Sequence, residues 1–319
     1  MTTQAMSYEE AVRIAAELDG SVIPHSSFQR ADEEVTRCII QSRYNREPEC
    51  CAVIGPSGSG KTLLCDVQIE RMPRKQIVEG DHEITCVPAF FTSIDSPTDI
   101  KALPRTILKQ LGHEDPGTYD LLCLNDMIKD NLATQRSEVM FIDEFHKLIN
   151  RGRRAVHINK RVCQWVQGLT NKSPTTICLV GTEEVEAIIR SDPELARRFP
   201  NVFPLRALSP GTRASPGDIQ WYLTELAKKA VEKCQIEAFP DFTNYLVALA
   251  SYAATSGNPS YIGKLLKQSV IIVLTSATRI VTTETLAQVW DSGILSSASL
   301  AKTNPFRMTE GQLAACFRK

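Results

Sequence analysis

The sequence predicts an α/β fold, in which a five-stranded parallel sheet carries a phosphate-binding loop and is followed by a C-terminal α-helical lid. Three observations predict it. Short apolar runs alternate with helical patterns between residues 46 and 208, as in parallel sheets that are covered on both faces. The first of these runs leads directly into a glycine-rich loop and then a helix. Beyond a linker rich in Pro, Gly and Ser at residues 208–217, only helical patterns follow.

The composition is that of a soluble globular protein. Hydrophobic residues make up 43% of the chain and charged residues 23%, and the formal net charge is −1. No apolar run approaches the roughly 18 residues that span a bilayer, and the N-terminus lacks the basic and apolar regions of a signal peptide. The ten cysteines show no C-x-x-C pair or zinc-type spacing, which indicates buried, reduced thiols. We therefore expect a cytoplasmic protein with no membrane partner.

The N-terminal segment, residues 1–45, has an amphipathic helical pattern that is broken at residues 23–27. Ser26 or Ser27 is suited to cap a helix over residues 28–40. Such a helix would brace the nucleotide pocket or a neighbouring subunit, or it would be a plain packing helix.

The phosphate-binding loop follows the apolar run at residues 50–54. It reads Gly55-Pro56-Ser57-Gly58-Ser59-Gly60-Lys61-Thr62 and opens into a helix at Leu63. Glycines let successive backbone N–H groups curl around phosphates, and the helix N-terminus adds partial positive charge. Lys61 would reach the β- and γ-phosphates, and the Thr62 hydroxyl would bind Mg²⁺. We expect residues 55–63 to bind a nucleoside triphosphate.

Two further strands and two helices are predicted downstream of this loop. The second strand is expected at residues 84–91, and helices are expected from residue 96 onward and over residues 119–132. Residues 139–142 then form an apolar run that ends in two acids, Asp143 and Glu144. Ligands of open α/β sheets bind where the strands end. Asp143 would hold Mg²⁺, and Glu144 would orient and polarise the attacking water.

The last two strands carry further candidate residues. A fourth strand at residues 176–180 ends at Gly181-Thr182, and Thr182 would contact the γ-phosphate or the attacking water. A helix then closes at Arg197 and Arg198, and a fifth strand follows at residues 201–205. Lid helices are expected at residues 219–234, 242–254, 260–275 and 283–290. We therefore divide the chain into a lead-in (1–45), a nucleotide-binding domain (46–208), a lid (209–298) and a tail (299–319).

This order of motifs, over about residues 45–290, resembles the AAA+ family of P-loop NTPases. The resemblance implies that Thr182 is the first sensor, and that Arg197 or Arg198 is the arginine finger. A finger reaches the ATP of a neighbouring subunit, which implies an ATPase that works as a homo-oligomer. The alternative for the arginine pair is a solvated helix end, where Arg is favourable in any case.

A closer resemblance, to the TniB/TnsC-type regulators of bacterial transposons, rests on the loop and two further segments. These are Leu179-Val180-Gly181-Thr182-Glu183-Glu184, with Ala187-Ile188-Ile189 and Asp192 after it, and Tyr261-Ile262-Gly263-Lys264-Leu265 in the lid. It implies an ATP-dependent ring or filament on duplex DNA that connects target-site selection to the transposase and disassembles on hydrolysis. Target selection would come from a protein or from an RNA-guided complex. Lys264 stands where many lids place a second-sensor arginine, and it lacks the planar fork of that residue.

The charge distribution favours contact with DNA. The segment 145–182 has no acidic residue and contains Lys147, Arg151, Arg153, Arg154, Lys160, Arg161 and Lys172. Such a block would bind phosphate backbones without reading sequence, or it would form salt bridges between subunits. The resemblance adds Lys101 and Arg105 as further backbone contacts.

The C-terminal tail contains one candidate for a partner contact, and two other functions fit the sequence less well. Phe306, beside Pro305, would dock a partner such as the transposase or pack back on the lid. A replication initiator or helicase loader is one rival, but residues after 290 show no helix-turn-helix pattern. A DNA-independent, ATP-gated signalling switch is the other.

Overall fold

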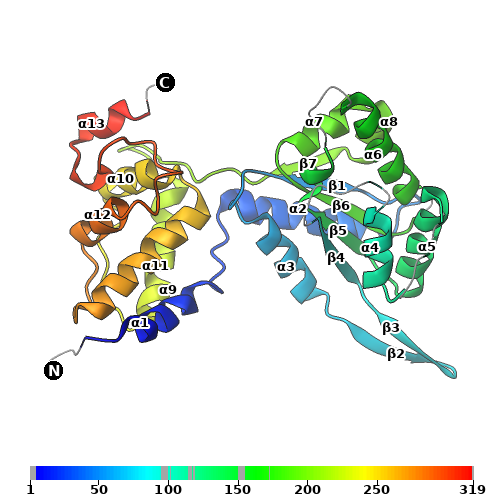
Figure 1. The fold of residues 1–319 in the computed structure, drawn as a ribbon, viewed down its shortest axis with the longest axis horizontal. Helices are drawn as coiled ribbons and strands as arrows, with labels where there is room; N and C mark the ends of the chain where they lie inside the picture. The colour runs from blue at the N-terminus through cyan, green and yellow to red at the C-terminus, as the bar shows by residue number, and fades with distance from the viewer. Residues whose placement is uncertain are drawn as a thin grey trace. The chain divides into compact units, whose positions relative to one another are not determined.

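The computed structural model of the chain describes residues 5–94, 100, 102–113, 117, 119–149, 155–171 and 173–317 (Figure 1). The chain divides into two compact units, one of residues 27–206 and one of residues 1–26 together with 207–319. The predicted divisions after residues 45 and 298 do not coincide with a boundary between these units. Among the described residues, no helix is long and apolar enough to cross a membrane.

The unit of residues 27–206 is built on a five-stranded parallel sheet, which confirms the predicted fold. The strand order is β4 (Ala89–Ser93), β5 (Val139–Asp143), β6 (Thr176–Gly181), β1 (Cys51–Ile54) and β7 (Asn201–Pro204). In the register, Cys51 lies opposite both Cys178 and Asn201. Because all the pairings are parallel, the carboxyl ends of the strands lie along one edge of the sheet.

Helices cover both faces of this sheet, which is why its strands read as continuous apolar runs. Alternate strand residues contribute to two separate cores. One core is shared with α2 (Ser26–Ser42) and α3 (Lys61–Arg71). The other is shared with α4 (Ala102–Gln110), α5 (Leu121–Thr134), α6 (Ala155–Thr170), α7 (Glu184–Ser191) and α8 (Pro193–Arg198).

The predicted strand at residues 84–91 is wrong in its bounds. An antiparallel hairpin of β2 (Lys75–Glu79) and β3 (His82–Cys86) precedes β4, and the predicted strand straddles β3 and β4. Gly80 has φ +60 at the turn, as two-residue hairpin turns require. Pro88 separates β3 from β4, because proline has no N–H group for a strand ladder.

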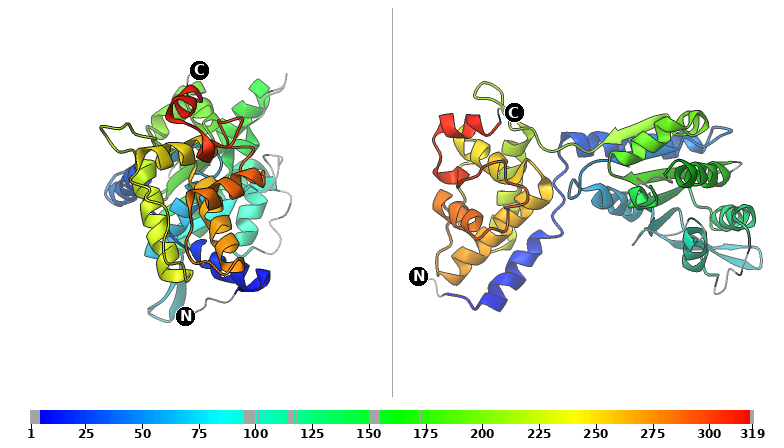
Figure 2. Two further views of the ribbon diagram at one scale, coloured as in Figure 1. Left: turned by 90° about the vertical axis from the view of Figure 1, so that its left-hand side faces the viewer. Right: turned by 45° about the horizontal axis from the view of Figure 1, so that its top comes forward.

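The second unit is helical. It contains α1 (Tyr8–Ala15), η1 (Ala16–Leu18), α9 (Asp218–Lys233), α10 (Tyr245–Thr255), α11 (Pro259–Thr275) and α12 (Thr283–Asp291). Two further views of the chain are given in Figure 2. Asn244, Asn258 and Thr282 accept backbone hydrogen bonds at the starts of α10, α11 and α12, so side-chain caps set these boundaries. Helix α1 packs against α11 within one apolar core.

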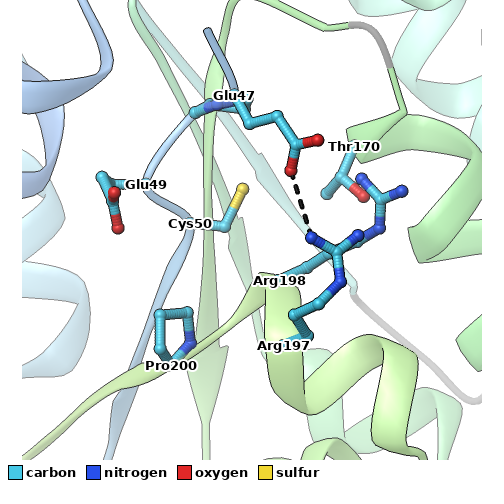
Figure 3. A pocket seen from close by; sticks show the side chains of 8 residues that line it. Glu47, Glu49, Cys50, Thr170, Arg197, Arg198 and Pro200 are labelled. Carbon is cyan, nitrogen blue, oxygen red and sulfur yellow. Dashed lines mark hydrogen bonds and ion pairs between the residues drawn. The ribbon is translucent and has the colours of Figure 1, made fainter. Parts of the chain in front are cut away.

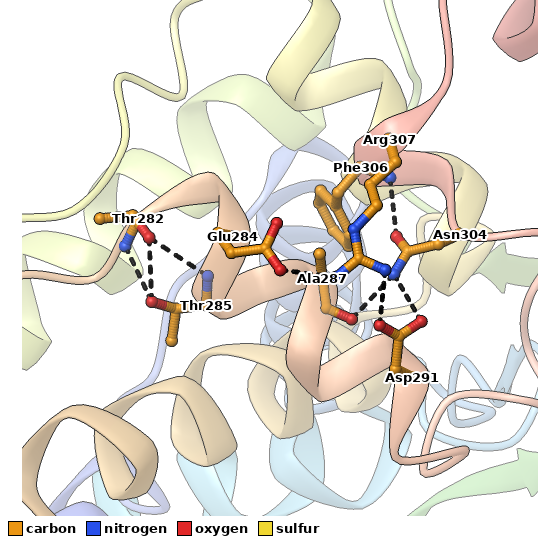
Figure 4. A network of polar contacts seen from close by, with 8 residues as sticks. All are labelled: Thr282, Glu284, Thr285, Ala287, Asp291, Asn304, Phe306 and Arg307. Atoms are coloured by element: carbon orange, nitrogen blue, oxygen red, sulfur yellow. Dashed lines mark hydrogen bonds and ion pairs between the residues drawn. The ribbon is translucent and has the colours of Figure 1, made fainter. Parts of the chain in front are cut away.

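The C-terminal segment, with η3 (Pro305–Arg307) and α13 (Glu310–Ala315), is fastened to the helices of this unit (Figure 4). Asn304 Nδ2 donates to the carbonyl oxygen of Ala287 (2.9 Å) and to Asp291 Oδ1 (2.8 Å). Arg307 pairs with both Asp291 (2.7 Å) and Glu284 (2.6 Å). Phe306 is half-buried against the apolar cores of this unit. Of its two predicted roles, packing on the lid therefore describes it.

The cysteines are structural thiols. All ten lie among the described residues, none forms a disulfide there, and all except Cys123 and Cys316 are buried. Burial raises the pKa of the Cys50 thiol to about 12 and that of Cys163 to about 11. These thiols are therefore protonated at neutral pH.

Candidate active site

The carboxyl-terminal edge of the sheet brings the predicted nucleotide residues together. The phosphate loop leaves β1, the acid pair leaves β5, and Gly181 and Thr182 leave β6. The backbone N–H of Gly55 donates to the carbonyl oxygen of Gly181 (3.0 Å), which ties the loop to the tip of β6.

The glycines of the loop occupy positions that a side chain would disturb. Gly58 and Gly60 have φ values of +78 and +95, in the left-handed region. A Cβ at Gly55 would lie 2.4 Å from the carbonyl oxygen of Leu205. Ser57 and Pro56 are exposed at the rim of the loop, and α3 begins at Lys61 beneath it. This arrangement forms the backbone cradle that phosphate groups require.

Lys61 is held inside the loop. Its side chain is buried, and Nζ donates to the carbonyl oxygens of Gly55 (2.9 Å) and Pro56 (3.0 Å). Burial lowers the pKa of Lys61, while the negative charges of Asp143 and Glu144 act in the opposite direction. The ammonium group is thus close to the position where a triphosphate would replace the two carbonyls.

Thr62 and Asp143 contact one another across the site. Thr62 Oγ1 donates to Asp143 Oδ2 over 2.6 Å, and Asp143 is only 2% exposed. A hydroxyl and a carboxylate are the oxygen ligands that Mg²⁺ prefers. The two predicted metal ligands therefore fit that ion.

Glu144 sits in a tight turn directly after β5. Its backbone is left-handed, with φ 58 and ψ 27, and its N–H donates to Asp143 Oδ1 (2.7 Å). A left-handed non-glycine residue costs about 1 kcal/mol or more and is frequent at functional sites. Its side chain is one-third exposed.

Two buried hydroxyls near this edge lack partners. Thr182 Oγ1, at the tip of β6, and Ser59 Oγ, in the loop, make no hydrogen bond to any described residue. Buried polar groups are normally satisfied. A bound ligand at this edge would supply the missing contacts.

Helix α2 packs against the phosphate loop and against α3. Phe28 is buried and lies 3.7 Å from where a Cβ of Gly60 would stand. Gln68, on α3, donates to Asp32 Oδ1 (2.7 Å), and Arg71 forms a bidentate pair with the same carboxylate. Of the roles weighed for α2, these contacts favour bracing the nucleotide pocket.

Arg197 and Arg198 lie at the opposite edge of the sheet, where α8 leads into β7 (Figure 3). They line a pocket of about 100 Å³ with Glu47, Cys50 and Thr170. Arg197 is 60% exposed and pairs with Glu47 over 3.3 Å, whereas Arg198 is only 13% exposed and pairs with Glu194. Arg197 is therefore the more exposed side chain of the two.

The remaining predicted residues are dispersed. Lys264 belongs to the helical unit, where Nζ lies 4.9 Å from the centre of the Tyr261 ring. Leu63 is partly exposed on α3. Lys160 and Arg161 are exposed on α6, and Arg105 is half-buried on α4. Predicted DNA contacts that lie outside the described residues are Lys101, Arg151, Arg153 and Arg154.

Two residues that sequence reasoning had not assigned to the nucleotide site are near Glu144. Lys147 Nζ and His146 Nε2 lie 3.2 Å and 3.7 Å from Glu144 Oε2. The spacing of three residues between Glu144 and Lys147 would have suggested a contact only if a helical turn had been expected there.

Comparisons with known proteins agree with this geometry. A family model described as "Bacterial TniB protein" matches residues 13–207. Similar solved structures include Aeropyrum pernix ORC2 in ADPNP–ADP complexes (TM-score 0.59, 13% identity, 88% of this chain and 71% of that one). Another is Cdc6p from Pyrobaculum aerophilum (TM-score 0.59, 14% identity, 87% of this chain and 70% of that one). A third is Drosophila ORC bound to DNA (TM-score 0.55, 17% identity, 92% of this chain and 69% of that one). No curated protein matches the chain.

At these identities the solved structures show the fold, which is the AAA+ fold. The match to the family model extends over most of the chain and includes the loop and the acid pair. A nucleotide-binding loop and a strand that ends in two acids on this fold identify the chain as an ATPase.

Proposed function

Because the chain belongs to the TniB family, we propose that it is an ATP-dependent regulator of DNA transposition. It assembles with copies of itself, as a ring or a helical filament, on duplex DNA. In this state it connects a target-selection protein or RNA-guided complex to the transposase, and ATP hydrolysis disassembles it. The observation that carries the proposal is that Lys61 and Thr62, which follow β1, and Asp143 and Glu144, at the end of β5, lie at the same edge of the sheet in a chain of this family.

Each residue of this edge has a separate task. The loop amides and Lys61 bind the phosphates, and Thr62 with Asp143 would hold Mg²⁺, which neutralises phosphate charge when bound. Glu144 accepts a hydrogen bond from the attacking water and orients it toward the γ-phosphate. Thr182, with its unpartnered hydroxyl, hydrogen-bonds to the γ-phosphate or to the same water. In the helical unit, Lys264 senses the nucleotide as the second sensor.

The second half of the site comes from a neighbouring subunit. Asn201, which follows the arginines, pairs with the first residue of β1, while the phosphate loop follows the last residue of that strand. A strand rises about 3.3 Å per residue, so Arg197 and the loop of the same chain lie at opposite ends of the sheet. Arg197 therefore acts on the ATP of the next subunit. Arg198, which is largely buried, supports the end of α8.

Contact with DNA is assigned to the basic residues between β5 and β6. Lys160 and Arg161 are exposed on α6, and neither forms an ion pair within the described part of the chain. Exposed lysines and arginines bind phosphate backbones without reading sequence. The Drosophila ORC structure, which shares the fold, contains DNA. Lys101, Arg105, Arg151, Arg153 and Arg154 are proposed as further contacts.

The test is electron microscopy of the full chain with duplex DNA, in the presence of ATP, of a slowly hydrolysed analogue, or of no nucleotide. Rings or filaments that form only with nucleotide, and that persist longer in Glu144→Gln, are the expected result. Glu144→Gln should bind ATP as the natural chain does and hydrolyse it at least about a hundredfold more slowly. If no nucleotide-dependent assembly forms on DNA, the proposal fails, and a DNA-independent switch becomes the better description.

A further inference from the structure

A pocket of about 360 Å³ lies beside α9 in the helical unit, and we call it the α9 pocket. The rings of Phe239 and Phe242 stand 6.3 Å apart and are tilted by 39° to each other. Aromatic rings attract one another at such distances, so the pair favours an aromatic occupant. Pockets of about 300–1,000 Å³ hold small ligands, so this one admits a single large side chain. The apolar part of its lining is Ala227, Val231, Phe239, Pro240 and Phe242.

One negative charge in the lining of this pocket has no cation beside it. The two other charged residues of the lining, Lys228 and Glu232, each have an oppositely charged partner on α9. Asp241 forms no ion pair within the described part of the chain, and its carboxylate accepts hydrogen bonds from the N–H (2.9 Å) and the hydroxyl (2.6 Å) of Thr243. These bonds lower the pKa of Asp241. The pocket therefore fits an apolar or aromatic side chain with a positive charge next to it.

The outer face of α2, in the unit of residues 27–206, carries exposed side chains of that kind. Ile40 is 44% exposed and Tyr44 is 84% exposed. The N–H of Asn45 donates to the carbonyl oxygen of Gln41 over 3.0 Å, so the helical turn continues past the end of α2. Residues four apart on a helix are neighbours on its surface. Ile40 and Tyr44 therefore form one surface, which we call the α2 anchor.

The charge around Tyr44 distinguishes it from other exposed side chains. Arg43 precedes it and pairs with Glu138, whereas Arg46 is exposed and forms no ion pair among the described residues. The other large apolar or aromatic side chains that are described and more than half exposed each have an acidic residue within two positions, and these are Tyr8, Val78, Tyr119 and Leu122. Asp241 would repel those acids. Of this group, only Tyr44 has a charge environment that complements the α9 pocket.

We propose that the α2 anchor of one chain docks in the α9 pocket of a second copy, with Arg46 beside Asp241. Tyrosine is enriched among the few residues that carry most of the binding energy of an interface, and such residues fill well-packed pockets. The anchor and the pocket are different surfaces of the chain. A contact between them is therefore head to tail, and its repetition builds a ring or a helix.

The position of the anchor favours a second copy over an unrelated partner. Glu47, three residues after Tyr44, pairs with Arg197. In the proposed function, Arg197 acts on the ATP of the next subunit, so the anchor adjoins a surface that meets another copy. The inference thus deepens the proposed function and rests on it.

The first experiment measures self-association of the full chain by sedimentation, with a slowly hydrolysed ATP analogue, in the presence and in the absence of duplex DNA. The variants are Tyr44→Ala, Tyr44→Phe and Tyr119→Ala. Tyr119 is the matched control, because it is also more than half exposed in the same unit. We expect Tyr44→Ala to weaken self-association about thirtyfold, as for a central tyrosine of an interface. Tyr44→Phe and Tyr119→Ala should assemble as the natural chain does.

Two failures of this experiment have different meanings. If Tyr44→Ala assembles as tightly as the natural chain, the docking is wrong and the proposed function stands. If the natural chain assembles in neither condition, the proposed function fails together with the docking. Thermal melting and binding of a fluorescent ATP analogue should be unchanged in all three variants, which shows that each of them is folded.

The second experiment exchanges the charges of Arg46 and Asp241. Arg46→Asp and Asp241→Arg should each weaken assembly about tenfold, because each places like charges opposite one another. A mixture of these two single variants should recover most of the assembly, since every head-to-tail contact in an alternating chain then joins opposite charges. A mixture of Arg30→Asp with Asp241→Arg is the control, because Arg30 is exposed on α2 away from the anchor, and it should not recover.

The mixture also decides whether the contact joins two chains. If both single variants are weakened and their mixture does not recover, the contact does not lie between copies and the proposal is overturned. Unchanged assembly in either single variant overturns the pairing of Arg46 with Asp241.

Discussion

The two edges of the parallel sheet differ in how much of the active site each one completes. At the carboxyl-terminal edge, Lys61 and Asp143 are buried, and Thr62 contacts Asp143 within the same chain. At the amino-terminal edge, Arg197 and Glu47 are 60% and 66% exposed and form an ion pair with each other over 3.3 Å (Figure 3). The first edge is organised before any ligand arrives. The second presents a charged side chain that stays largely in solvent.

This difference follows from the cost of burying charge. A buried charge is stable only where hydrogen bonds and opposite charges surround it. The loop carbonyls and the acid pair supply such surroundings for Lys61. The Arg197 charge stays largely in solvent, so it needs no such surroundings and makes one exposed ion pair with Glu47.

The largest effect is expected at the loop edge, from Lys61→Ala. This change removes the ammonium group that two loop carbonyls hold in place, and with it the main charge for the β- and γ-phosphates. We expect binding of a fluorescent ATP analogue to weaken by about a hundredfold or more even in the monomeric chain. Tight binding by Lys61→Ala would mean that nucleotide affinity does not depend on the Lys61 ammonium group.

Arg197→Ala should show the opposite behaviour, with normal nucleotide binding and a kcat about a thousandfold lower, as for fingers supplied in trans. Arg198→Ala should instead lower the stability of the chain by about 1 kcal/mol, because its stem is packed. Steady-state kinetics and thermal melting separate the two variants.

A mixture of Arg197→Ala and Glu144→Gln chains tests whether Arg197 acts between subunits. Some sites of a mixed oligomer combine an intact Glu144 with an intact Arg197 from the neighbour. ATPase activity should therefore partly return on mixing two inactive proteins. If activity does not return while mixed oligomers form, Arg197 does not act in trans.

The smallest effect is expected from Glu47→Gln. Exposed ion pairs contribute about 0–1 kcal/mol, so the midpoint of urea unfolding should barely move. A large loss of stability would show that the arginine edge is a structural contact and not a surface kept open for a neighbour. Arg43→Gln, which removes the exposed pair with Glu138, serves as the matched control.

Much of the nucleotide site was predictable because its chemistry depends on local spacing. Strand, glycine loop and helix are contiguous in the sequence, and Asp143 and Glu144 end an apolar run, so the parallel sheet alone brings them together. The helices of the second unit were also predicted to within a few residues, because capping residues mark their starts.

Other features could not be predicted from the sequence, because they depend on contacts between distant residues or on a local backbone conformation that no residue pattern indicates. The β2–β3 hairpin was missed, since a short apolar run spans the end of one strand and the start of the next around Pro88. The exposure of Arg197 and the burial of its neighbour Arg198 follow from how α8 packs, and both residues look alike in sequence. The contact between Lys147 and Glu144 required a 3₁₀ turn that no residue pattern indicated.

The packing of α1 against α11 has a consequence for synthesis on the ribosome. At about 5–20 residues per second, α1 emerges roughly 12–50 s before the start of α11 is translated. Until α11 is made, Ala11, Ile14 and Ala15, which the finished protein buries, lack the helix against which α1 packs. The segment 27–206, which contains every strand of the parallel sheet, is translated within the same interval. The nascent chain therefore exposes an amphipathic helix to chaperones while its nucleotide-binding unit is already able to fold.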